Sequence, residues 1–112
     1  MLLIAVVCHA QNIVPAEARK YMGEIVTVCG QVSSVQTSQD LDEHPTVIGF
    51  GPVFPNNIFS VVVLEEDAGS FSYKLKDLKE KRVCVTGTVV TAFGKPGIFV
   101  FDPTQIEEDN NQ

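Results

Sequence analysis

The chain has no tryptophan, only two histidines and few basic residues, and these shortages exclude several classes of function. Eight Lys and Arg residues stand against fourteen Asp and Glu residues, which gives a net charge of -6. That sign is wrong for a protein that holds phosphate backbones mainly through its overall charge. We therefore expect no tight, nonspecific binding to nucleic acid, although this balance is compatible with a local basic patch.

Sequence motifs that carry catalysis are also missing. The chain has no nucleophile elbow, no glycine loop of the kind that cradles phosphate, and no histidine-rich zinc motif. General acid–base catalysis needs positioned, desolvated groups, whereas the paired carboxylates here fall in polar loops or at the end of an expected strand. We predict a protein that is not an enzyme and that carries no cofactor.

Apolar runs are short, and one of them occupies the first ten residues. Met1–Ala10 is apolar and ends in a small residue, which is typical of the end of a secretory signal peptide cut after Ala10. It lacks a basic leading stretch, so a truncated signal peptide and a first strand or buried N-terminal element are the two interpretations. The first predicts a secreted or periplasmic protein, and the second a cytoplasmic one. No later stretch is long and apolar enough to span a membrane.

Cysteine is scarce, and Cys8 would be removed together with a signal segment. Cys29 and Cys84 remain, within two similar stretches, residues 26–32 (VTVCGQV) and 83–89 (VCVTGTV). The alternation of valine with small or polar residues predicts two half-buried strands whose valines face one shared core, as in a small closed β-barrel. Each cysteine lies on the opposite face of its strand. If the strands are neighbours, the thiols can form a disulfide; two reduced, packed thiols are the alternative.

The rest of the pattern reads as one domain of short strands and turns. Pro15 opens a short helical segment and Gly23 stops it, while apolar residues every three to four positions predict a second helix further on. Residues 11–106 form the expected domain, and 107–112 an acidic disordered tail. The expected elements are helices over 15–22 and 68–78 and strands over 24–36, 46–50, 58–64, 83–89 and 98–101.

Three strands, a helix and two strands follow the order of the OB-fold, a five-stranded barrel with its helix between strands three and four. Over residues 14–106 the chain resembles small bacterial OB-fold proteins described as nucleic-acid-binding or tRNA-anticodon-binding-like. The resemblance implies an all-β, five-stranded OB-fold barrel and a non-catalytic module that binds single-stranded nucleic acid or a nucleotide. It is carried by Tyr21–Val32, Phe54–Val63, Lys81–Gly87 and Gly94–Ile98.

Ligands of the OB-fold lie across strands two and three, between the loops that join strands one to two and four to five. On this chain that surface holds aromatic residues near a cation, the combination that stacking on unpaired bases requires. Each aromatic has a second interpretation as a core residue, and a turn also explains the asparagines. The predicted ligand-binding residues are Phe50, Phe54, Asn56, Asn57, Phe59, Phe93 and Lys95, with Lys95 as the contact to phosphate.

The loop after the first long strand argues against a nucleic-acid ligand. Its carboxylates, Asp40, Asp42 and Glu43, would repel a passing phosphate chain. Together with His44 they also suggest metal ligands, but their spacing matches no EF-hand or zinc motif, so we expect a solvated acidic loop and no metal. The alternative function is therefore an exported module that binds an envelope protein or a saccharide.

Overall fold

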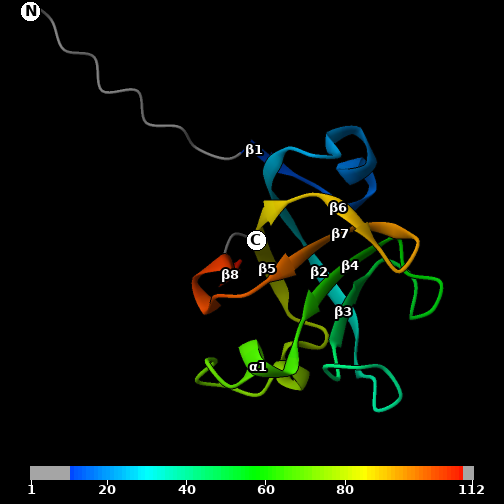
Figure 1. Ribbon diagram of the computed structural model, residues 1–112. Coiled ribbons are helices and arrows are strands. Elements are labelled where there is room, and N and C mark those ends of the chain that lie inside the picture. Colours follow the sequence, from blue (N-terminus) through cyan, green and yellow to red (C-terminus); the bar gives the residue numbers. More distant parts are fainter. Residues whose placement is uncertain (1–10, 110–112) are drawn as a thin grey trace, which may run out of the picture.

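The computed structural model describes residues 11–109, which form a strongly curved sheet of eight short to medium strands (Figure 1). The hydrogen-bonded order is β6-β7-β4-β3-β2-β5-β8, and β1 pairs with β2 in parallel. The β4–β7 pair is also parallel, whereas the other pairs are antiparallel. The strands are β1 (Gln11–Ile13), β2 (Ile25–Thr37), β3 (Thr46–Phe50), β4 (Phe59–Val63), β5 (Arg82–Thr88), β6 (Val90–Ala92), β7 (Lys95–Val100) and β8 (Ile106–Glu108).

Strand β2, 13 residues long, belongs to two halves of the sheet. Its first part pairs with β1 and β5, and its second part pairs with β3 after a register shift between Val32 and Ser34. Gly30 lies just before the shift, where a Cβ atom would come within 2.9 Å of Pro15 Cγ and 3.3 Å of a Phe50 ring carbon. Glycine at this position therefore lets both side chains pack on the strand. We call β1, β2, β5 and β8 half-sheet 1, and β2, β3, β4, β7 and β6 half-sheet 2.

The core lies between the two half-sheets, and valine is its commonest residue. Phe50 and Phe59 are fully buried at its centre, with ring centroids 5.7 Å apart in an edge-to-face arrangement. Burying each ring stabilises the fold by roughly 1.5–3 kcal/mol. The 3₁₀ helix η1 (Pro15–Tyr21) covers one side of the core through Ala18, and η2 (Leu75–Leu78) covers another through its two leucines.

The disulfide predicted as one of two alternatives is present. Cys29 on β2 lies directly opposite Cys84 on β5, and the two sulfur atoms are bonded at 2.08 Å. The bond joins residues 55 positions apart along the chain. Disulfides persist mainly in oxidising compartments, so this bond favours an extracellular or periplasmic setting.

The prediction of a closed five-stranded barrel is wrong in two respects. The structure has eight strands, and the sheet is not closed. Closure of the barrel would require β5 to pair with β7, but both edges of each strand are already used: β5 lies between β2 and β8, and β7 lies between β4 and β6. The short strands β6 and β8 therefore occupy the edges that closure needs.

The segment predicted as one helix over 68–78 is split. A four-residue helix, α1 (Glu65–Ala68), is followed by an irregular stretch and then by η2. The apolar spacing still marks the buried side, because Phe71, Leu75 and Leu78 all pack into the core. The N-terminal helix exists as the 3₁₀ helix η1.

The C-terminal end differs from the expected tail. A 3₁₀ helix, η3 (Pro103–Gln105), leads into β8, in which Glu107 and Glu108 are paired with β5. The predictions made for residues 1–10 and for 110–112 lie outside the described residues. Within residues 11–109, no helix is long and apolar enough to cross a bilayer.

Candidate functional site

A pocket of about 370 Å³ lies on the outer face of half-sheet 2. Its floor is formed by Val47 of β3 and Ser60 of β4, and one wall by the end of β2 and the loop that follows it. The opposite wall comes from residues 54–55 and from the turn between β6 and β7. Three of the predicted site residues, Phe54, Phe93 and Lys95, line this one pocket.

Lys95 is held in the pocket by a small hydrogen-bond network. Its ammonium group donates to Asn57 Oδ1 at 2.9 Å and to the backbone carbonyl of Pro55, and it lies 5.9 Å from the centroid of the Phe54 ring. The Asn57 side chain is buried and donates in turn to Phe59 O at 3.0 Å and to Ser60 Oγ at 2.8 Å. Asn57 therefore positions Lys95 from behind the pocket.

The charge of Lys95 is not neutralised by a neighbouring carboxylate in the described part of the chain. The ion pairs there are His44–Glu65 and Arg82–Asp109. An ammonium group has three N–H donors, of which two are used by Asn57 and Pro55. The third donor and the positive charge remain available to an anion.

The two aromatic side chains of the pocket are exposed, Phe54 at 37% and Phe93 at 51%. Phe93 and Gly94 form a two-residue turn between the paired residues Ala92 and Lys95, with φ angles of 51° and 78°. Turns with two positive φ values favour Asn or Gly, because a side chain such as that of Phe is strained in this region. Backbone strain of this kind gathers at functional sites, so the ring of Phe93 is a strong candidate for a ligand contact.

The remaining predicted residues are placed elsewhere. Phe50 and Phe59 are fully buried, so the core interpretation holds for them and a ligand on the outer face cannot touch either ring. Asn56 is exposed and donates its backbone N–H to Val53 O at 3.0 Å, as the turn interpretation expects, and it does not line the pocket.

Sequence reasoning missed the wall formed by the end of β2 and the loop after it. Thr37 and Thr46 close this loop through a hydroxyl–hydroxyl hydrogen bond of 2.8 Å. Leu41 lies in the loop, lines the pocket and is 48% exposed. A lone leucine in an otherwise polar loop was the available signal.

The acidic residues of the same loop, which we call the acidic rim, do not line the pocket themselves. Asp40, Asp42 and Glu43 are exposed beside Leu41. His44 does not join them in a cluster of potential metal ligands; its Nδ1 atom pairs with Glu65 Oε2 at 2.5 Å. The pocket thus has one cationic side at Lys95 and one acidic rim.

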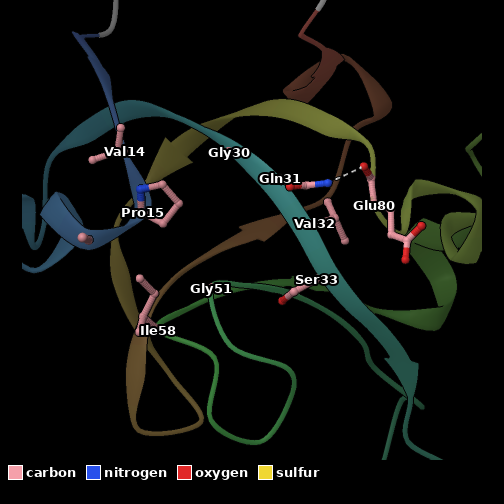
Figure 2. Close-up of a pocket in the computed structure, with 10 residues that line it drawn as sticks. Val14, Pro15, Gly30, Gln31, Val32, Ser33, Gly51, Ile58 and Glu80 are labelled. Atoms are coloured by element: carbon pink, nitrogen blue, oxygen red, sulfur yellow. Dashed lines mark hydrogen bonds between the residues drawn. The ribbon is translucent and has the colours of Figure 1, made fainter.

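A second pocket, of about 520 Å³, lies along an earlier part of β2, residues 30–33 (Figure 2). Val14 and Pro15 form one side and Gly51 and Ile58 the other, while Gln31 points across to donate to Glu80 O at 3.0 Å. None of the predicted ligand-binding residues lines it. The two pockets are therefore distinct.

Comparison with known proteins supports the fold and leaves the function open. No family model and no curated protein matches the sequence. Among solved structures, yeast Stn1 and Ten1 give a TM-score of 0.63 at 12% identity over 92% of this chain. OBody AM1L10 bound to hen egg-white lysozyme gives 0.56 at 20% identity over 95% of this chain and 100% of the other. An aspartyl-tRNA synthetase from Leishmania major Friedlin gives 0.53 at 12% identity over 96% of this chain.

The chain spans 64% of the matched Stn1 and Ten1 chain and 22% of the synthetase chain. At such low identities the likeness shows the fold alone. It gives no support to the bacterial affiliation expected from the sequence. Residues 11–109 thus form an open, eight-stranded sheet whose fold is similar to the OB-fold.

Proposed function

We propose that the protein is a non-enzymatic OB-fold module that binds single-stranded nucleic acid, or a nucleotide, in the pocket between Phe54 and Phe93. The observation that carries this proposal is the convergence of two exposed rings and one unneutralised ammonium group on one pocket. Rings stack on bases with little regard for sequence, and a cation between them is suited to a phosphate.

The expected affinity is modest, because the site offers one fixed cation next to an acidic loop. One phosphate contact predicts a slope of about -0.7 for log K against log salt with a single strand. Each stacked base adds roughly 1–3 kcal/mol. Stacking, more than charge, is therefore expected to supply most of the binding free energy.

Two of the compared structures point to possible ligand classes. The Leishmania protein is by its name a synthetase that acts on tRNA. The OBody structure holds a protein, lysozyme, as its partner. The first agrees with the proposed ligand, and the second agrees with the alternative considered below.

The test is fluorescence anisotropy of the full chain with short labelled single-stranded DNA and RNA at low and moderate salt. The informative pair of variants is Lys95→Met and Lys76→Met, which remove the same charge inside and outside the pocket. We expect Lys95→Met to weaken binding by about fivefold or more and to flatten the salt dependence, and Lys76→Met to change it by less than about twofold.

Equal effects of the two substitutions would assign the contribution of Lys95 to net charge alone and would refute the site. Because Lys95 also holds the loop that carries Pro55, thermal melting of both variants must accompany the titrations. No saturable binding at low salt would refute the nucleic-acid ligand altogether.

A second candidate function is binding of an envelope protein or a saccharide on the same face. It is favoured by the acidic rim beside the pocket and by the apolar side chains of Leu41 and Val47 in its lining. Polar rims around apolar centres are typical of protein interfaces. Failure of the oligonucleotide titration would make this candidate the leading one.

Export from the cytoplasm completes the proposal, and the Cys29–Cys84 disulfide supports it. Expression of the full gene followed by cell fractionation and mass spectrometry tests this. We expect a mature chain that begins at Gln11 outside the cytoplasm. A cytoplasmic chain beginning at Met1 with two free thiols at Cys29 and Cys84 would contradict it.

A further inference from the structure

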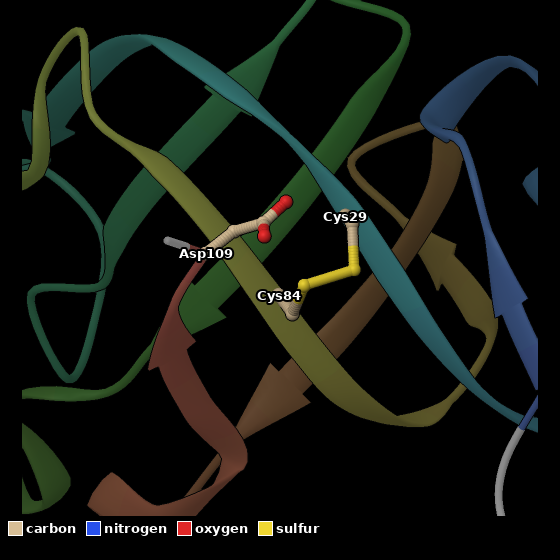
Figure 3. A group of neighbouring side chains, drawn as sticks. All are labelled: Cys29, Cys84 and Asp109. Carbon is tan, nitrogen blue, oxygen red and sulfur yellow. A yellow bond between two sulfur atoms is a disulfide. The ribbon is translucent and has the colours of Figure 1, made fainter. Parts of the chain in front are cut away.

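Three potential metal ligands lie together on the outer face of half-sheet 1, far along the chain from one another (Figure 3). The sulfur atoms of Cys29 and Cys84 and a carboxylate oxygen of Asp109 are all within 4.8 Å of one another. All three residues are partly buried, and the Asp109 side chain is only 12% exposed. In the described part of the chain, no other such group of three appears.

Two members of this cluster lie on strands, and the third directly follows a strand. Cys29 and Cys84 are direct partners in the β2–β5 register, with Cα atoms 4.0 Å apart. Asp109 directly follows β8, and its backbone N–H donates to Arg82 O at 2.9 Å, which extends the β5–β8 pairing by one position. Sites built on strands hold their geometry better than sites built on loops.

We propose that reduction of the disulfide turns this cluster into a binding site for a thiophilic divalent cation such as Zn²⁺. A dithiol supplies two electrons and two protons to the Cys29–Cys84 bond, which becomes two thiols while the dithiol becomes a disulfide. Metal binding then releases the two thiol protons to solvent, so that two thiolates and the Asp109 carboxylate surround the ion.

The donor set suits zinc or cadmium. Thiolates select thiophilic metals, and two thiolates with one carboxylate leave a fourth tetrahedral position for water. In a tetrahedral site with Zn–S bonds of about 2.3 Å, two thiolates lie about 3.8 Å apart. The three donor atoms lie within 4.8 Å of one another in the oxidised protein, and the two cysteine side chains must rotate apart to the zinc spacing once the bond is reduced.

The charge of the site also balances once the ion is bound. Two thiolates and one carboxylate carry three negative charges, and a divalent cation leaves one of them. Arg82 Nη2 lies 3.6 Å from Asp109 Oδ2 and compensates this remaining charge. In the oxidised protein the sulfur atoms are no longer thiolates, so the disulfide and the metal exclude each other.

The test uses the full chain with Cys8→Ser, which removes the third thiol. The protein is reduced with dithiothreitol, desalted without oxygen and titrated with Cd²⁺, while the ultraviolet charge-transfer band of cadmium thiolate is recorded. We expect saturation at one equivalent for the reduced protein and no band for the oxidised protein. Equal cadmium binding by both forms, or no band after reduction, would overturn the proposal.

Two matched variants separate ligation from general charge. Asp109→Asn removes the third ligand, and Glu107→Gln removes the same charge from the residue that pairs with Cys84 on β8. We expect Asp109→Asn to weaken cadmium binding by at least about tenfold, and Glu107→Gln by less than about twofold. Similar losses from both variants would show that Asp109 is not a ligand.

Folding of the reduced protein is followed in parallel by far-ultraviolet circular dichroism. A native spectrum with bound Cd²⁺ supports a site built on the sheet. If the reduced chain is unfolded and Cd²⁺ does not restore the native spectrum, the cluster is not a metal site of the folded protein. Slower alkylation of the two thiols in the presence of Zn²⁺ would support the same site with the second metal.

Discussion

Replacing Phe93 by Asn separates the contribution of this ring to ligand binding from its contribution to stability. Phe93 is the first residue of a two-residue turn in which both φ angles are positive, at 51° and 78° with Gly94. Asn followed by Gly is the preferred sequence for such a turn. The substitution therefore removes the aromatic ring and relieves backbone strain at the same time.

The two effects on stability nearly cancel. Relief of the left-handed strain favours Asn by about 1 kcal/mol. Phe93 is 51% exposed, so loss of its partly buried ring costs about 1 kcal/mol. The free energy of unfolding should therefore stay within about 1 kcal/mol of the parent value, whereas loss of one stacked base should weaken nucleic-acid binding by about 1–3 kcal/mol, or roughly 5- to 150-fold.

Urea denaturation gives the first quantity and oligonucleotide anisotropy the second. Phe101→Asn is the matched control, because Phe101 is 68% exposed and lies outside the pocket. The reasoning is refuted if both variants weaken binding equally. It is also refuted if Phe93→Asn leaves binding intact and lowers stability by more than about 2 kcal/mol, since the ring would then be a packing residue.

Three further predictions concern the fold. Replacing both cysteines of the disulfide by serine removes the link that closes a loop of 55 residues, and so increases the conformational entropy of the unfolded chain. The free energy of unfolding should fall by about 4 kcal/mol in urea denaturation. A loss below about 1 kcal/mol would contradict this entropic argument. Gly97→Ala places a Cβ atom 2.4 Å from Ser60 O and should disturb the β4–β7 pair. We expect it to lower the free energy of unfolding by about 1–3 kcal/mol in the same urea denaturation. An unchanged free energy of unfolding would show that this contact relaxes freely. Hydrogen bonds from the Thr104 backbone and side chain lower the pKa of Asp102 from 3.8. The stabilising effect of the Asp102 carboxylate should be present above pH 3.8, its ordinary pKa, and be lost as the pH falls through the lower pKa of the folded state. NMR titration of this carboxyl group checks the prediction. A pKa at or above 3.8 would argue against Asp102 as the N-cap of η3.

The parts of the fold that could be predicted were those with a repeating pattern. The β3 boundaries at Thr46 and Phe50 were found from sequence, because a buried β-branched run is bounded there by turn residues. The phase of two valine-rich strands placed both cysteines on the face opposite the valines, but whether the strands are neighbours was left to the structure. In the two cysteine strands a period of two carries the information within the segment itself, whereas the continuous apolar run of β3 is marked by the turn residues around it.

The strands that were missed are β1, β6 and β8, each three residues long. So short a segment has no measurable period, and it becomes a strand because a neighbour offers it a free edge. The same limit explains why a closed barrel was predicted. The edges that would have closed it are covered by strands that the sequence pattern does not reveal.

The candidate site was predicted in part, for a related reason. Phe54 and Phe93 lie in loops and Lys95 is the first residue of β7, next to a loop, and the loops around a barrel face could be inferred from the fold. Phe50 and Phe59 lie in strands whose residues are buried on both faces, and no alternation distinguishes the core side from the ligand side there. Burial decided their role, and burial depends on the tertiary structure.

Both ends of the described chain lie on half-sheet 1, where β1 pairs with β2 and β8 pairs with β5 (Figure 1). The pocket with Phe93 and Lys95 lies on half-sheet 2. A group attached close to Gln11 or Asp109 is therefore joined to the half-sheet that does not carry the pocket. Under the proposed function, two copies joined by a flexible linker should bind one single-stranded nucleic acid at once, so that a weak single site yields avidity through effective concentration.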